Sequence, residues 1–161
     1  MDYKNIFFVF TFMFFSFNSS FIPFFSKKKT IEIGEFTEKI RFLDKSFAFD
    51  IKKNLEECVE KYSSLKMVPE NGDIVIKGVF LDYIMTYVGD TPIQKFKLIM
   101  RIYYKDKLEP KKNWKKCFSS SEYFLYKNYE DNIFLNEPAI DQVTRYLTIK
   151  IFNKISSCSE D

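Results

Sequence analysis

Four basic residues alternate with apolar residues along one segment of the chain. Lys95, Lys97, Arg101 and Lys105 are separated by even numbers of positions, and we call them the basic stripe. The apolar positions between them are Phe96, Leu98, Met100, Ile102 and Tyr104. Side chains two residues apart on a β-strand lie on one face, about 6.6 Å apart. The pattern predicts a strand whose row of cations can bind phosphates or carboxylates, or simply a solvated sheet face.

Nucleic acid is a less suitable ligand for this stripe. Tyr103 lies among the cations, and Lys111, Lys112, Lys115 and Lys116 extend the positive region near the next turn. However, 25 Lys and Arg stand against 22 Asp and Glu, a formal net charge of +3. This balance is not typical of a protein that binds nucleic acid without specificity, so we expect no nucleic-acid partner.

Residues for catalysis are scarce. The chain has no histidine, which excludes Ser-His-Asp and Cys-His catalysis and the histidine-based zinc motifs, and its 4 glycines form no phosphate-binding loop. Ser119-Ser120-Ser121 therefore has no histidine to activate it. No spacing brings two carboxylates to a working distance, the candidates being Glu56, Glu57, Asp73, Asp82 and Asp90. We predict a protein that is not an enzyme and has no catalytic residue, cofactor or metal.

Three cysteines give little further information. Cys58, Cys117 and Cys158 are odd in number and lack the spacing of metal ligands. We expect free or buried thiols, with a Cys58–Cys117 bridge as the alternative if the domain is exported.

The amino terminus differs in composition from the rest of the chain. A short charged start precedes an apolar run from Ile6 to Phe15 and a small polar stretch, the layout of a secretory signal peptide. A retained membrane anchor is the alternative, because the apolar region to Phe25 approaches the roughly 20 residues that span a bilayer. Lysines 27 to 29, which follow the run, favour this alternative. Either way, residues 1–25 form a signal peptide or anchor, and residues 29–157 form one domain.

The remaining elements follow from periodicity. Alternation predicts strands over 30–36, 73–88, 95–105 and 114–124, with Gly78 marking a bulge or a close backbone approach. A turn is predicted at residues 69–72, in which Gly72 is able to take a positive φ. Steps of three and four residues predict a helix over 41–62 and a closing helix that begins at Glu137, with Asn136 as its N-cap. The first helix is expected to bury Leu43, Phe47, Ile51, Leu55, Cys58 or Val59, and Tyr62, and the second Ile140, Val143, Leu147, Ile151 and Ile155.

Two helices with one apolar stripe each are best buried on one face of a sheet. The predicted fold is therefore α+β, with two helices on one face of a four-stranded, mostly antiparallel sheet in the order β-α-β-β-β-α. The other face of the sheet is then free.

Several short motifs resemble one known family. The closing helix contains Ile151-Phe152-Asn153-Lys154, similar to the C-terminal helix of the LPS-assembly lipoproteins (LptE family) of the Bacteroidetes type. Four further motifs resemble the family's strands and first helix in the same order: Lys29-Thr30-Ile31-Glu32-Ile33, Phe36-Thr37-Glu38-Lys39, Asn71-Gly72-Asp73-Ile74-Val75-Ile76-Lys77-Gly78 and Phe118-Ser119. The resemblance extends from about residue 29 to residue 155.

The resemblance implies a non-catalytic subunit on the periplasmic side of the cell outer membrane. Family members plug and support the β-barrel LptD and contact lipopolysaccharide (LPS), so the expected partners are an LptD-type barrel and LPS. The family's lipobox cysteine is missing, because no cysteine precedes Cys58, and we therefore expect no lipidation. We place LPS contact on Lys95, Lys97, Arg101 and Lys105 from their face and charge. The alternative function is an envelope carrier that binds lipid between helices and sheet.

Overall fold

The computed structural model describes residues 28–42, 45–125 and 137–159. The expected signal peptide or anchor at residues 1–25, the proposed N-cap Asn136 and Leu43 lie outside these residues. Within the described ranges, no helix is long and apolar enough to span a bilayer.

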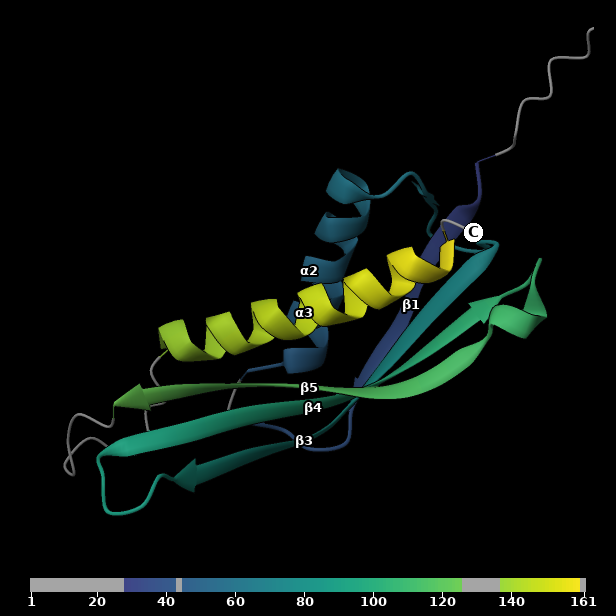
Figure 1. Ribbon diagram of the computed structural model, residues 1–161. Coiled ribbons are helices and arrows are strands. Elements are labelled where there is room, and N and C mark those ends of the chain that lie inside the picture. Colours follow the sequence, from purple (N-terminus) through teal and green to yellow (C-terminus); the bar gives the residue numbers. More distant parts are fainter. Residues whose placement is uncertain (1–27, 43–44, 126–136, 160–161) are drawn as a thin grey trace, which may run out of the picture.

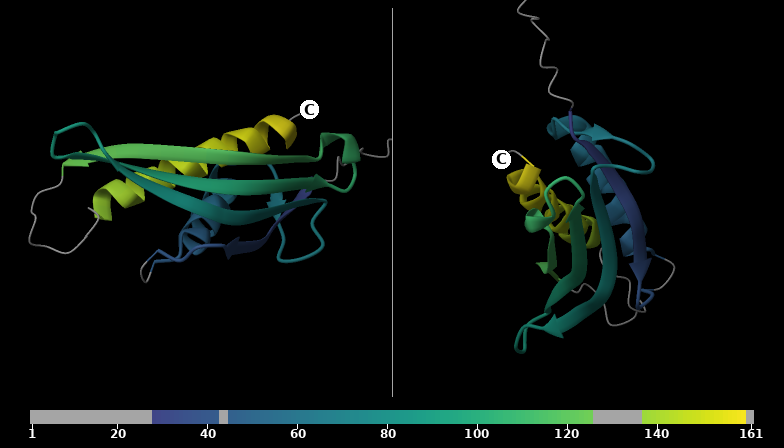
Figure 2. Two further views of the ribbon diagram at one scale, coloured as in Figure 1. Left: turned by 90° about the horizontal axis from the view of Figure 1, so that it is seen from below. Right: turned by 90° about the vertical axis from the view of Figure 1, so that its right-hand side faces the viewer.

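One sheet and two helices form two layers (Figure 1). The strands are β1 (Thr30–Glu38), β2 (Lys66–Met67), β3 (Ile74–Tyr87), β4 (Ile93–Asp106) and β5 (Trp114–Leu125). The helices are α2 (Phe47–Tyr62) and α3 (Glu137–Ser159), and a short 3₁₀ turn, η1 (Pro110–Lys112), joins β4 to β5. Both helices cover the same face of the curled sheet, with α2 over β1 and α3 over β4 and β5 (Figure 2). The predicted α+β class and the placement of both helices on one face are confirmed.

The prediction of a four-stranded, mostly antiparallel sheet is wrong in two details. The sheet has five strands in the order β2-β1-β3-β4-β5, and β1 is parallel to both of its neighbours. After β1 the chain returns through α2, and a helical crossover of this kind leads into a parallel strand. The strand β2 is only two residues long, which is too short to produce an alternating pattern. The pairs β3–β4 and β4–β5 are antiparallel, as predicted.

The first helix begins at Phe47 instead of residue 41. Ser46 is its N-cap, and Phe42 instead forms an isolated bridge with Lys45. The predicted apolar positions Phe47, Ile51, Leu55 and Val59 are buried, whereas Tyr62 is exposed at the end of the helix. All five apolar positions predicted for α3 are buried.

Two glycines allow close approach between strands. Gly72 is buried, and a Cβ there would lie 2.7 Å from the backbone nitrogen of Glu32. In the turn predicted at residues 69–72, the residue with a positive φ is Asn71, at 59°, and not Gly72. Gly78 fulfils its prediction, because a Cβ there would lie 2.5 Å from the Phe36 ring. Opposite Gly78, β1 contains an extra residue between Ile33 and Phe36, which is a bulge.

Candidate anion-binding face

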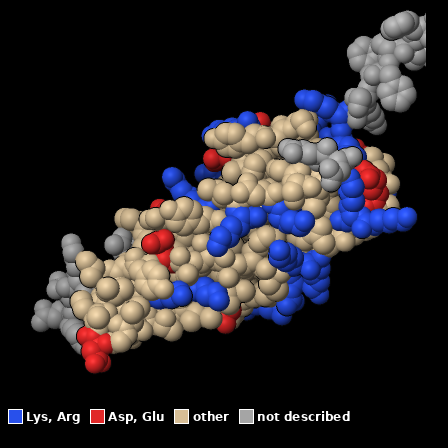
Figure 3. Space-filling model, in the orientation of Figure 1, with Lys and Arg blue, Asp and Glu red and all other residues tan. Residues whose placement is uncertain are grey.

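Strand β4 places the basic stripe on the open face of the sheet. Phe96, Leu98, Met100 and Ile102 are fully buried against the helices, as their alternation with the cations predicts. The side chains of the basic stripe therefore point away from α2 and α3. Lys105 is exposed, and the other three are half-buried among neighbouring side chains of the same face. Figure 3 shows the molecule from the side on which α3 is seen in Figure 1, and there too Lys and Arg gather over the middle while acidic residues form smaller, separate groups.

The strand register adds two cations to this face. Tyr103 of β4 pairs with Lys77 of β3 on one side and with Lys115 of β5 on the other. Arg101 and Lys105 are two residues away along β4, so the Cα atoms of all four cations lie within about 7 Å of that of Tyr103. We call these four cations and the ring they surround the Tyr103 cluster. Ile99 separates this cluster from Lys95 and Lys97.

Among the residues that the structure describes, no acidic side chain forms an ion pair with the basic stripe. The ion pairs within the described ranges have nitrogen–oxygen distances of 3.8 Å or less and involve other lysines. None of them includes Lys95, Lys97, Arg101 or Lys105. Aromatic rings provide contacts in place of carboxylates. The Nζ of Lys95 lies 5.3 Å from the ring centre of Tyr123, and that of Lys115 lies 5.2 Å from the ring centre of Tyr103.

Arg101 keeps its charge at every physiological pH. Its hydrogen bonds with the side chains of Cys117 and Tyr103 raise the pKa of Arg101 above the ordinary arginine value. The face can therefore bind phosphate or carboxylate groups by charge-assisted hydrogen bonds. An acyl chain or the apolar face of a sugar ring can lie against Tyr103 or Tyr123 while an anionic group of the same ligand meets the lysines.

Comparison with known proteins shows similarity at the level of the fold. No protein-family model matches the sequence, and no curated protein matches it. The hypothetical protein CT253 of Chlamydia trachomatis has a TM-score of 0.61 at 8% identity, covering 82% of this chain and 98% of that chain. A minor lipoprotein of Acinetobacter baumannii has a TM-score of 0.51 at 13% identity, covering 80% and 91%. Lipoprotein B of Nitrosomonas europaea has a TM-score of 0.51 at 10% identity, covering 83% and 85%. The structural neighbours of this fold thus include bacterial lipoproteins.

The carboxylates considered for catalysis are spread over α2, β3 and the turns next to β3. Asp73 accepts hydrogen bonds from the backbone nitrogen and hydroxyl of Thr30, at 2.9 and 2.7 Å, and so joins β3 to β1. Asp82 accepts from the nitrogen of Tyr83 at 2.8 Å, at an irregularity of β3. Glu56 lies 3.8 Å from Lys52 on α2. Each of these three carboxylates has a local structural contact.

The structure also shows where the three consecutive serines and the three cysteines lie. Ser119, Ser120 and Ser121 lie in β5, where Lys150 of α3 donates to the carbonyl of Ser119, not to a hydroxyl.

All three cysteines are free, so the alternative Cys58–Cys117 bridge does not form. Cys58 lies on α2, over one face of the sheet, and Cys117 is exposed on the other face, opposite Arg101. Burial raises the pKa of the Cys58 thiol, which makes it a poor nucleophile. The described residues contain no group of three metal-binding side chains.

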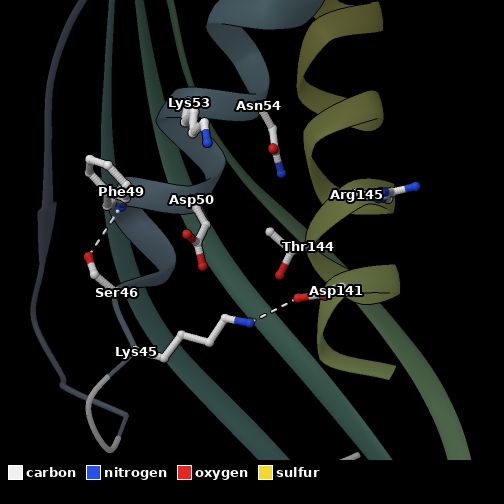
Figure 4. Close-up of a pocket in the computed structure, with 9 residues that line it drawn as sticks. All are labelled: Lys45, Ser46, Phe49, Asp50, Lys53, Asn54, Asp141, Thr144 and Arg145. Carbon is white, nitrogen blue, oxygen red and sulfur yellow. Dashed lines mark hydrogen bonds and ion pairs between the residues drawn. The ribbon is translucent and has the colours of Figure 1, made fainter. Parts of the chain in front are cut away.

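A pocket lies between the first turns of α2 and α3 (Figure 4). Its volume is about 520 Å³, and eight of its nine lining residues are polar or charged, Phe49 being the exception. Lys45 reaches across to Asp141 at 2.9 Å, Asp50, Asn54 and Thr144 point into the space, and Arg145 points away. This pocket is too polar for an acyl chain. No sequence pattern indicates it, because its residues come from the starts of two helices that are far apart in the chain.

Proposed function

We propose that this chain is a non-catalytic subunit of LPS transport and assembly at the cell outer membrane. It acts on the periplasmic side, plugs and supports an LptD-type β-barrel, and contacts LPS through the basic stripe. The observation that carries this proposal is a row of cations, on a sheet face that the helices leave open, for which the described residues provide no acidic partner. Unpaired Lys and Arg side chains on an open face can bind the anionic groups of a ligand.

Several properties support the proposal. The lumen of an outer-membrane barrel is polar, and a two-layer domain with one charged face is suited to such a surface. The phosphates of lipid A are natural ligands for Lys and Arg. The LptE-like motifs and the lipoprotein neighbours of the same fold agree with an envelope location. Because the lipobox cysteine is missing, membrane association would come from the apolar segment at residues 1–25 or from the barrel.

The carrier alternative requires an apolar space between helices and sheet. The side chains at this interface, among them Ile51, Leu55, Leu98 and Leu147, are fully buried against one another. The pocket between α2 and α3 is lined mainly by charged and polar groups. These observations favour docking on the open face over enclosure of a lipid.

Binding of LPS to the open face can be tested with a double charge reversal. The full-length wild type is expected to bind vesicles that contain LPS, and to bind them less as salt concentration rises. Lys95→Glu/Arg101→Glu should lower the affinity by about tenfold or more, because each reversal replaces an attraction with a repulsion at the phosphates.

The matched control is Lys53→Glu/Lys61→Glu, which changes the net charge equally but lies on exposed positions of α2. It should bind LPS vesicles nearly as the wild type does. Equal binding by the wild type and Lys95→Glu/Arg101→Glu, or an equal loss in both double variants, would remove the basic stripe from the proposed function.

A further inference from the structure

Strand β5 is a long and open edge of the sheet. It is the outermost strand, with 12 residues, and its inner side pairs with β4. On its outer side, Lys150 of α3 donates to the carbonyl of Ser119 at 3.0 Å. Within the described ranges, no backbone hydrogen bond joins β5 to an element other than β4. An edge of this kind is a template for another strand.

The backbone groups on the outer side can be assigned from the register. The nitrogen of Val88 donates to the carbonyl of Ile93, and the nitrogen of Lys107 donates to the carbonyl of Asp73. These two bonds show that the backbone N–H and C=O groups of odd-numbered residues in β4 point toward β3. The backbone groups of even-numbered residues in β4 therefore point toward β5, where they pair with even-numbered residues. The odd-numbered residues of β5, from Lys115 to Leu125, therefore direct their N–H and C=O groups outward. The contact between Lys150 and the Ser119 carbonyl agrees with this assignment.

The side chains of β5 are complementary to a second copy of β5. When two copies run antiparallel with Ser119 opposite itself, Lys116 faces Glu122 of the second copy, and Lys115 faces Tyr123. The small Ser119, Ser120 and Ser121 then lie at the centre of the pair. A shift by two residues in either direction places Lys116 opposite Ser120 or Phe124 and loses both charge pairs. Only the register centred on Ser119 therefore matches opposite charges.

Helix α3 offers a second contact beside this edge. Tyr146 is 45% exposed and lies four residues before Lys150, so the two are neighbours on the helix surface. Because Lys150 reaches Ser119, the exposed ring of Tyr146 lies on the side of α3 that is nearest the β5 edge. A two-fold axis perpendicular to the sheet would keep both copies of α3 on one face, so Tyr146 of each copy would approach the other copy.

We infer that two copies of this chain, when free of other partners, pair antiparallel along β5 with Ser119 at the two-fold axis. The two five-stranded sheets join into one, and the ammonium of Lys150 gives up the Ser119 carbonyl to the second copy. This pairing also covers the open edge, which otherwise favours aggregation. The inference does not depend on the proposed function.

Sedimentation of the purified full-length chain in density-matched detergent tests this inference. The wild type is expected to sediment as a dimer. Lys116→Glu and Glu122→Lys should each weaken the dimer at least about tenfold, because each places like charges opposite one another at both ends of the interface. Lys116→Glu/Glu122→Lys should restore it. Within one chain the two residues are about 20 Å apart, so the rescue requires a second copy.

The control variant is Lys105→Glu on β4, which changes the charge away from the edge and should remain a dimer. Thermal unfolding of each variant checks that the fold is retained. A monomeric wild type would overturn the inference. A dimer that is insensitive to the single reversals, or that the double reversal does not restore, would overturn it as well.

Discussion

Lys29 connects the start of β1 with the turn between β4 and β5. Its ammonium lies 3.3 Å from the buried carboxylate of Asp106 and also contacts Glu109, which in turn pairs with Lys112 at 3.2 Å. Asp106 uses its other oxygen to accept from the backbone nitrogens of Leu108 and Glu109. The hydrogen bond with Glu109 is the main cause that raises the pKa of Lys29, and hydrogen bonds with Lys29 and Lys112 lower the pKa of Glu109.

These shifts predict how stability depends on pH. Because the pKa of Glu109 is lower in the folded state, its contribution is full above its ordinary value of about 4.3 and is lost as the pH falls through the lowered pKa. Because the pKa of Lys29 is raised, its contribution is full below about 10.4 and is lost as the pH rises through the raised pKa. Stability from this group of residues is therefore greatest between these limits.

Glu109→Gln tests the acidic limit. At pH 7 the variant should melt at a lower temperature than the wild type, because an amide carries no charge for Lys29 and Lys112. The difference should vanish at a pH below the lowered pKa of Glu109, where the wild-type carboxyl is also neutral. Melting temperatures measured from pH 3 to pH 7 provide the comparison, and a difference that stays constant over this range would contradict the assigned pairing.

The positions of the basic stripe could be predicted from sequence because they depend only on residues close together in the chain. The basic stripe follows from alternation within one strand, and the structure places all four residues on the open face. Lys77 was not predicted to join them, because its place beside Tyr103 depends on the pairing of β3 with β4. An irregularity of β3 between Phe80 and Asp82 shifts that pairing by one residue, and alternation within a single strand does not reveal it.

At the scale of elements, the first turn of α2 is joined to the end of β1. Ser46 accepts a hydrogen bond from the nitrogen of Phe49 at 3.2 Å and donates one to Glu38 at 3.0 Å. The same Glu38 oxygen accepts from the nitrogen of Ala48, also at 3.0 Å. Two of the free N–H groups at the helix start are therefore satisfied by side chains. This capping explains why the helix begins at Phe47 although apolar spacing continues toward residue 41.

Ser46→Ala should lower the free energy of unfolding by about 1 kcal/mol, the usual effect of removing an N-cap. Ser46→Thr should retain most of the stability, because threonine can make both hydrogen bonds. Urea unfolding of the wild type and the two variants measures the difference. If Ser46→Ala unfolds at the wild-type urea concentration, the cap does not determine where α2 begins.

The helices and strands predicted best from sequence are those in which apolar residues repeat regularly over many positions. Helix α3 repeats apolar residues at three and four positions over its whole length, and its predicted buried residues are all buried. Strand β2 was missed because two residues carry no period. The parallel pairing of β1 was missed because it is a property of the crossover through α2, not of the residues in β1.

At the scale of the molecule, the layers follow from apolar surface alone. Each helix buries one row of apolar side chains against the same face of the curled sheet. The opposite face is left uncovered and carries the cations. The sequence predicted this division but not the surface between the helices, where Lys45 and Asp141 meet across distant segments. The charged open face is the part of the molecule that the proposed function uses.

The most direct test of the proposed function is to recover the full-length, tagged chain from membranes with its partner. The proposal predicts that one outer-membrane β-barrel of LptD type co-purifies in a fixed ratio, identified by mass spectrometry. Identical extraction of an unrelated tagged envelope protein serves as the control. Recovery of the chain from membranes without any such barrel would contradict the proposal.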